Sequence, residues 1–308
     1  MTEHPMRPFI LAGVDGSPAA SRAVTWAAAE AHSRGVALLL ATVIDIGTEY
    51  SPYAGVTEEL YGRMQEDARN ALAAAEQQVV EQFPAVPTSV VVKSGPPAAG
   101  LITLSRDALL TVVGATGRGR FSSILLGTVA LALVTSDSCP VAVIRGVGED
   151  DVVPQTGPVV LGIDGTKGSD AAIRWAFDEA SRRATTLTAV HTWTDRTTAT
   201  ARVYAPQTGK DYDAADAEHS EILAERLAGW QEKYPDVTVR RVMTPGEAAD
   251  TLLTHARGAQ LVVVGSRGHG DATGVVFGSV SRMLIHHSPC PVLVARNRPA
   301  TASRSHGD

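Results

Sequence analysis

Short apolar runs alternate with longer segments of helical periodicity along the whole chain. This alternation is typical of βαβ units and a parallel sheet. In the first half, the pattern predicts strands near residues 8–14, 36–44, 88–93, 109–114 and 140–145. Helices are expected near residues 18–34, 57–82, 97–106 and 124–136. The second half predicts strands near residues 158–163, 186–192, 236–242, 260–265 and 291–296.

The two halves of the chain repeat one another. Val14-Asp15-Gly16 recurs as Ile163-Asp164-Gly165 at an offset of 149 residues. Near the end of each half, Cys139-Pro140-Val141 recurs as Cys290-Pro291-Val292 at an offset of 151 residues. A repeat of this length means that the chain carries the same supersecondary plan twice.

The boundary between the repeats is expected within residues 146–157, where Gly, Pro, Asp and Glu interrupt the apolar periodicity. A length of 308 residues fits two domains of ordinary size. We therefore predict one domain at residues 1–150 and a second at residues 151–308.

The predicted fold class is α/β, with two tandem doubly wound domains. Each domain is expected to be a five-stranded parallel sheet in the order 3-2-1-4-5, with helices on both faces. In such a sheet, ligands bind beyond the carboxyl ends of the strands where the winding direction reverses, here between strands 1 and 4. This topology brings Asp15 close to Gly114 and Gly117 in the first domain. In the second domain it brings together Asp164, Gly265 and Gly268.

A glycine pattern follows strand 4 in both repeats. The first repeat has two glycines three residues apart, then nine residues, and then Gly127-Thr128. The second repeat has the same spacing and ends on Gly278-Ser279. Backbone N–H groups in such a loop form a concave site for anions, and the following helix adds its N-terminal dipole and a hydroxyl. The pattern favours a phosphate site.

Structural explanations compete with this hypothesis. The glycines are also suited to strand-to-helix turns and close packing, and Asp15 and Asp164 are also suited to capping a helix. Arg118 and His269 follow the second glycine of their loops, where they are either phosphate ligands or solvated side chains.

These residues resemble the universal stress protein family over nearly the whole chain, and the two-domain actinobacterial type in particular. The resemblance rests on the opening strand with Asp-Gly-Ser, the first helix with Trp26 or Trp175, the double glycine motif and the Cys-Pro-Val strand. It implies ATP as the ligand, with Mg²⁺ as a candidate companion ion. The candidate ligand-binding residues are those that the resemblance implies and those next to its glycine motif. In the first repeat they are Gly13, Asp15, Gly16, Ala41, Gly114, Gly117, Arg118, Gly127, Thr128 and Val129. In the second repeat they are Ile163, Asp164, Gly165, Val190, Gly265, Gly268, His269, Gly278, Ser279, Val280 and Ser281.

The two copies depart from each other inside these motifs. Ser281 is a possible extra phosphate donor where the first repeat has Ala130, and Thr166-Lys167-Gly168 replaces Ser17-Pro18-Ala19. We therefore expect the two sites to differ in affinity.

Other candidate residues have simpler interpretations. His191 is expected to be a packed or hydrogen-bonded histidine, and the four tryptophans are expected to pack in cores or interfaces. Glu30 and Glu179 are interpreted as parts of solvated helix faces. No C-x-x-C or H-E-x-x-H motif occurs, so no metal site is predicted.

Composition narrows the function further. The net charge is −6, with scattered Lys and Arg, so nucleic acid is not an expected partner. No apolar run approaches the ~20 residues of a membrane helix, and no secretory signal precedes the first strand. The two cysteines lie at matching places and are expected to pack as reduced thiols rather than to form a disulfide. These features favour a cytoplasmic protein that does not contact membranes.

Three function classes remain. The first is a nucleotide-binding regulatory or sensory module in a stress response. The second is a slow ATP-hydrolysing enzyme, for which the chain offers no Walker-type lysine, and the third is an interaction scaffold that binds no nucleotide.

Strand 5 is expected at a sheet edge that needs covering. We predict that the fifth strands of the two domains meet, and that the chain forms a homodimer.

Overall fold

The computed structural model describes residues 8–45, 58–117, 126–136, 138–146, 152–193, 220–221, 223–266 and 277–296. Contacts between Cα atoms divide the chain into two compact units. The first unit comprises residues 1–118, 127–141 and 296–308, and the second comprises residues 119–126 and 142–295.

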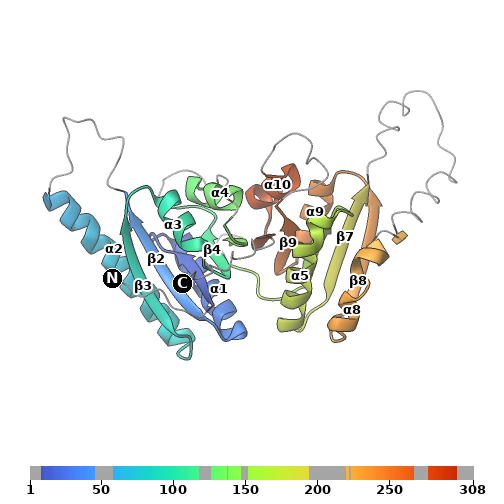
Figure 1. The fold of residues 1–308 in the computed structure, drawn as a ribbon, viewed down its shortest axis with the longest axis horizontal. Coiled ribbons are helices and arrows are strands. Elements are labelled where there is room, and N and C mark those ends of the chain that lie inside the picture. Colours follow the sequence, from blue (N-terminus) through green and yellow to red (C-terminus); the bar gives the residue numbers. More distant parts are fainter. Residues whose placement is uncertain are drawn as a thin grey trace, which may run out of the picture. The chain divides into compact units, whose positions relative to one another are not determined.

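The first repeat alternates strands and helices as its sequence predicts (Figure 1). Its elements are β1 (Phe9–Gly13), α1 (Pro18–Arg34), β2 (Ala37–Ile44), α2 (Glu58–Gln82), β3 (Thr88–Ser94), α3 (Pro97–Ser105), β4 (Leu110–Gly114), α4 (Thr128–Thr135) and β5 (Val141–Ile144).

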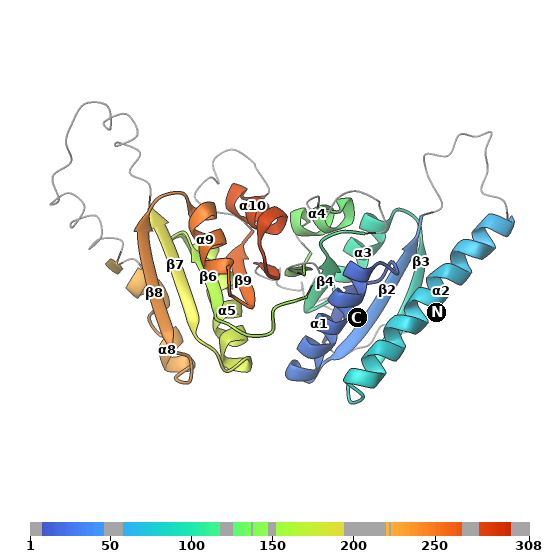
Figure 2. The same ribbon diagram turned by 180° about the vertical axis from the view of Figure 1, so that it is seen from behind.

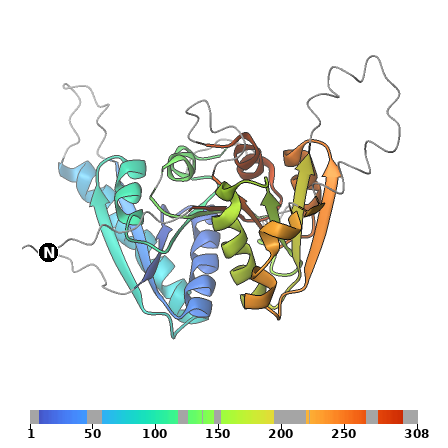
Figure 3. The same cartoon turned by 45° about the vertical axis from the view of Figure 1, so that its right-hand side comes forward.

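The second repeat follows the same plan. Its elements are β6 (Val159–Ile163), a 3₁₀ turn (Lys167–Ser169), α5 (Asp170–Arg182), β7 (Leu187–Trp193), α8 (Trp230–Lys233), β8 (Val239–Pro245), α9 (Ala248–Ala256), β9 (Leu261–Gly265), α10 (Ser279–His287) and β10 (Val292–Ala295). This repeat comes forward in Figure 3, where the paired strands β7 (yellow) and β8 (orange) lie side by side.

Both repeats have the predicted strand order. The first runs β3-β2-β1-β4-β5 and the second β8-β7-β6-β9-β10, which is 3-2-1-4-5 in each case. The central strand β1 is parallel to β2, with Phe9 opposite Ala37, and parallel to β4, with Ile10 opposite Leu110. In the first repeat, α1 and α2 cover one face of the sheet and α3 and α4 the other (Figures 1 and 2). The doubly wound α/β prediction is confirmed.

Local sequence explains where α1 begins and ends. The Oγ of Ser17 accepts a hydrogen bond of 3.1 Å from the N–H of Ala20, and Pro18 occupies the first turn. Gly35 ends the helix in the left-handed region at φ 63°, which favours glycine. The predicted bounds of 18–34 are therefore correct to the residue.

Two predicted boundaries are wrong. The helix expected from residue 124 begins at Thr128, because Gly127 is its N-terminal cap and has extended backbone. The strand expected from residue 236 begins at Val239, because the N–H of Val237 donates to the Tyr234 carbonyl at 3.1 Å and closes a turn there. In each case a residue that the apolar pattern assigns to the element, Gly127 or Val237, is held outside it by its local backbone.

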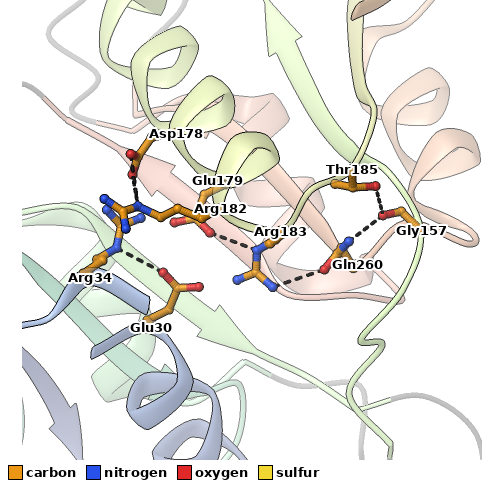
Figure 4. A network of polar contacts seen from close by, with 9 residues as sticks. All are labelled: Glu30, Arg34, Gly157, Asp178, Glu179, Arg182, Arg183, Thr185 and Gln260. Carbon is orange, nitrogen blue, oxygen red and sulfur yellow. Dashed lines mark hydrogen bonds and ion pairs between the residues drawn. The ribbon is translucent and has the colours of Figure 1, made fainter. Parts of the chain in front are cut away.

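The interpretation of Glu30 and Glu179 as solvated is also wrong. The Glu30 side chain is 6% exposed and accepts a hydrogen bond of 3.1 Å from Arg34 Nε. At the matching place in the second repeat, the side chain of Glu179 is 0% exposed and accepts one of 2.9 Å from Arg183 Nε (Figure 4). An arginine four residues along the helix reaches back to each carboxylate, so a charged residue becomes compatible with the buried face.

The four tryptophans pack against other side chains, as the sequence predicts. Trp26, Trp175 and Trp193 are buried. Trp230 is half-buried and stacks on Phe177, with ring centroids 6.0 Å apart.

No helix in the described ranges has the length and apolar character needed to cross a membrane.

Both cysteines are free and buried, and they pack as the sequence predicts. Burial raises the pKa of the Cys139 thiol from 9.0 to about 11, and burial likewise raises the pKa of Cys290 to about 11. Between about pH 9 and pH 11 the unfolded chain therefore releases two protons that the folded chain retains.

We expect this difference to lower the stability of the protein as the pH rises through that window. The loss amounts to roughly 1.4 kcal/mol per pH unit for each thiol, because only the unfolded state ionises there. Urea unfolding at several pH values measures the slope. A variant carrying Cys139→Ala and Cys290→Ala is the control and should have a shallower slope, whereas equal slopes would contradict the prediction.

Candidate functional site

The loops that follow the first and fourth strands meet in the first repeat. Asp15 lies just beyond β1, and Gly117 lies three residues beyond the last residue of β4. A methyl group on Gly117 would lie 2.9 Å from Oδ2 of Asp15. The two residues that the predicted topology brings to the switch point are therefore neighbours.

Neither aspartate caps the first helix of its repeat. Asp15 Oδ1 accepts a hydrogen bond of 2.9 Å from the N–H of Ser17, and Ser17 itself is the cap. Asp164 Oδ1 accepts hydrogen bonds from Thr166 N–H at 2.9 Å, Thr166 Oγ1 at 2.9 Å and Ser169 Oγ at 2.6 Å. Both carboxylates shape the loop after the first strand, so the capping explanation does not account for them.

In both repeats the same backbone hydrogen bond joins the third glycine of the motif to the residue after the first glycine. The N–H of Gly127 donates to the Ala115 carbonyl at 2.8 Å, and the N–H of Gly278 donates to the Ser266 carbonyl at 3.0 Å. A helix starts directly after each glycine, and neither helix has a side-chain cap. Among the described residues no side chain caps the N–H groups of either first turn, so these groups are suited to an anion.

The interiors of these loops are outside the described residues. Arg118, Gly268 and His269 belong to them, so their roles stay predictions.

Packing alone explains some of the glycines. A methyl group on Gly114 would lie 2.7 Å from the carbonyl carbon of Ala19 in α1, and Gly16 and Gly165 have φ values of 77° and 79°. Gly13 also has close neighbours, since a methyl group there would lie 3.1 Å from Val113 Cγ1. The positions of Gly114, Gly16 and Gly165 therefore favour glycine whether or not a ligand binds, whereas the position of Gly13 fits a methyl group once the Val113 side chain moves by a few tenths of an ångström.

Gly127 is different. Its φ is −64°, and a methyl group there would meet nothing nearer than the Ala115 carbonyl oxygen at 3.6 Å. Neither the backbone nor the packing of the described residues requires a glycine at this position. Close approach of a ligand to the backbone is a sufficient reason for it.

In each repeat, residues near the end of the second strand form hydrogen bonds with the backbone at the end of the first strand. The N–H of Val14 donates to the Ala41 carbonyl at 2.8 Å, and Thr42 Oγ1 donates to the Val14 carbonyl. In the second repeat the buried His191 takes the place of Thr42, and its Nδ1 donates to the Ile163 carbonyl at 2.8 Å. The prediction of a hydrogen-bonded histidine is confirmed, although the sequence alone did not indicate that Thr42 and His191 share this role.

Successive residues in the first turn of α4 differ from one another in exposure, and the first turn of α10 shows the same order. Thr128 and Ser279 are exposed, and Val129 and Val280 are half-buried. Ser281 is buried, and its Oγ donates to the Gly265 carbonyl at 2.6 Å. A hydroxyl has one hydrogen to donate, so Ser281 would have to give up this bond before it could donate to a phosphate.

Fold and loop geometry together define a class: a tandem doubly wound α/β protein, in whose first repeat the loops after the first and fourth strands meet at the switch point. The family comparison agrees with this description. The model of the "Universal stress protein family" matches residues 6–145 and 156–296, and the chain belongs to that family.

Similar proteins extend over both repeats. A universal stress protein of Mycobacterium tuberculosis is 40% identical over 297 residues, which cover 93% of this chain and 96% of the relative. One of Mycolicibacterium smegmatis is 37% identical over 297 residues and covers 94% of this chain and 97% of its own length. The crystal structure of a universal stress protein from Archaeoglobus fulgidus shares the fold, with a TM-score of 0.67 at 22% identity, and covers 94% of this chain and 98% of that chain.

Proposed function

We propose that each repeat binds ATP or a close relative, and that the chain acts as a regulatory or sensory module rather than as a dedicated enzyme. The observation that carries the proposal is the contact of Asp15 with the Gly117 loop. A carboxylate is an acceptor for ribose hydroxyls or a ligand for Mg²⁺. The neighbouring glycine loop and uncapped helix supply donors for phosphate.

The described residues fit such a ligand in the first repeat. Acceptor and donor groups lie on two loops at one edge of the sheet, and Gly127 leaves the backbone accessible without a packing reason. Gly13 and Ala41 line the adjacent strand ends, where the family resemblance implies the adenine side. The ligand would be held by this chain's backbone N–H groups at the phosphates and by Asp15 at the ribose or the ion.

The first test is the release of nucleotide from purified, heat-denatured protein. Recovered ATP or ADP supports the proposal, and recovery of a cyclic nucleotide would change the ligand but keep the class. Phosphate production from ATP that is lost on Asp15→Asn and Asp164→Asn would instead support a slow hydrolase. If no nucleotide is released and none binds on titration, the scaffold class is favoured.

The Gly117→Ala variant tests the site itself. Its methyl group would displace the Asp15 carboxylate, so we expect the affinity of the first site for ATP to fall roughly tenfold or more. The sequence predicts the same effect for Gly268→Ala at the second site. Titration calorimetry measures the stoichiometry and both affinities.

A matched control is available in α2. A methyl group on Gly62 would meet nothing within 4 Å, so Gly62→Ala should leave nucleotide binding unchanged. Unchanged affinity and stoichiometry in the chain carrying both Gly117→Ala and Gly268→Ala would rule out this site assignment. A homodimer, a cytoplasmic location and a domain boundary near residue 150 stay predictions from the sequence.

A further inference from the structure

The first and second helices of each repeat are linked differently. In the first repeat the link is neutral: Ser21 Oγ and Gln78 Oε1 are 2.8 Å apart, and Gln78 Nε2 donates to the Ser21 carbonyl at 3.0 Å. In the second repeat the link is ionic, between Asp170 Oδ1 and Arg226 Nη1 at 3.9 Å.

Arg226 makes a second contact, with the loop after the first strand of its repeat. It lies on the helical segment 223–227, and its Nε donates to the Gly165 carbonyl at 3.0 Å. Gly165 directly follows Asp164 in the proposed site. The second helical region of this repeat therefore reaches the loop after the first strand.

The position of Arg226 corresponds to Gln78. Each of these residues links the second helical region of its repeat to the same place on the first helix, because Asp170 matches Ser21 at the offset of 149 residues. Both Gln78 and Arg226 are half-buried. The second repeat therefore has a guanidinium where the first has a neutral amide.

The rest of this loop is held by hydrogen bonds between its own residues. Three donors converge on Asp164 Oδ1, and the N–H of Asp164 donates to Ser169 Oγ at 3.2 Å. Arg226 adds a tie from outside the loop through Gly165. Its side chain is 26% exposed, so part of the guanidinium is accessible from solvent.

We propose that Arg226 is a specificity-determining residue of the second site, which orders the Asp164–Ser169 loop and makes this site prefer nucleotides that carry more phosphate. The inference rests on the proposed nucleotide binding and concerns the difference between the two sites. A cation beside the loop stabilises each added negative charge of the ligand and offsets the repulsion from Asp164. Asp170 cancels only part of this charge, because it lies 3.9 Å away and is 54% exposed.

The experiment uses the full chain with Gly117→Ala, so that the second site dominates binding. Calorimetry compares ATP, AMP and adenosine at low and high salt for Arg226, Arg226→Gln, Arg226→Lys and Arg226→Ala. We expect Arg226→Gln to lower the preference for ATP over adenosine roughly fivefold to tenfold at low salt, and less at high salt. Arg226→Lys should retain most of the preference, since the charge remains.

Arg240→Gln is the charge-matched control. Arg240 is exposed near the start of β8, at the edge of the sheet opposite the carboxyl ends, so its loss should not change the preference. An unchanged ratio of ATP to adenosine affinities in Arg226→Gln would overturn the inference while leaving nucleotide binding intact. If the parent chain binds none of the three ligands, the proposed function fails, and this inference fails with it.

Discussion

Replacing Gly157 with alanine is expected to lower the free energy of unfolding of the second unit by about 3–5 kcal/mol. Gly157 has a φ of 108°, where side chains are rarely tolerated, and a methyl group there would lie 2.1 Å from the Gly258 carbonyl oxygen. Its own carbonyl accepts hydrogen bonds from Thr185 Oγ1 at 2.9 Å and Gln260 Nε2 at 2.6 Å. The backbone cannot shift away without breaking both bonds (Figure 4).

Urea unfolding followed by tryptophan fluorescence measures this loss. Gly62→Ala is again the control, because Gly62 lies inside α2 with open space around it. There alanine should raise stability by about 0.5–1 kcal/mol, since glycine is the poorer helix former. A Gly157→Ala variant with an unchanged urea midpoint would show that the backbone here is free to relax.

The second large effect is expected at the buried ion pair of α5. Arg183→Ala should lower the free energy of unfolding by about 3–5 kcal/mol, because it leaves the Glu179 carboxylate buried without its cation. The side chain of Glu179 is 0% exposed, and Arg183 also donates to Gln260 Oε1 at 3.2 Å. The variant therefore loses contacts to two buried side chains.

The neighbouring arginine provides a direct comparison. Arg182 pairs with Asp178 at the same i, i+4 spacing and 3.1 Å, but these side chains are 33% and 23% exposed. Arg182→Ala should therefore cost less than ~1 kcal/mol. Replacing Glu179 and Arg183 together with leucine should recover much of the loss, since no charge is then left buried. Equal losses for Arg182→Ala and Arg183→Ala would contradict the importance of burial.

The two aspartate loops show how far local sequence reaches. Their motifs recur in both halves, and the strand order then requires that Asp15 and Gly117 share one edge of the sheet. The sequence does not reveal that Ser17 rather than Asp15 caps α1, or that three donors converge on Asp164. Those outcomes depend on the side-chain rotamers within each loop.

Arg226 shows a different limit. It lies 61 residues along the chain from Gly165, and no motif or spacing connects them. Its contact exists because the helical segment 223–227 packs near the loop of the first strand. The sequence already places Lys167 in this loop where the first repeat has Pro18, and the tertiary structure adds Arg226 to that charge difference between the two repeats.

The sequence by itself determined the repeat, the alternation of strands and helices, the limits of α1 and the glycine motif, because these depend on apolar periodicity and on turn residues that act locally. Only the tertiary structure decided the environment of each charged side chain. Glu179 is a charged residue but lies in the core, because Arg183 reaches back to it and the packing around α5 excludes water from the carboxylate. The pairing follows the local i, i+4 spacing, but the burial of the pair is set by segments distant in sequence, and the local pattern carries no information about that burial.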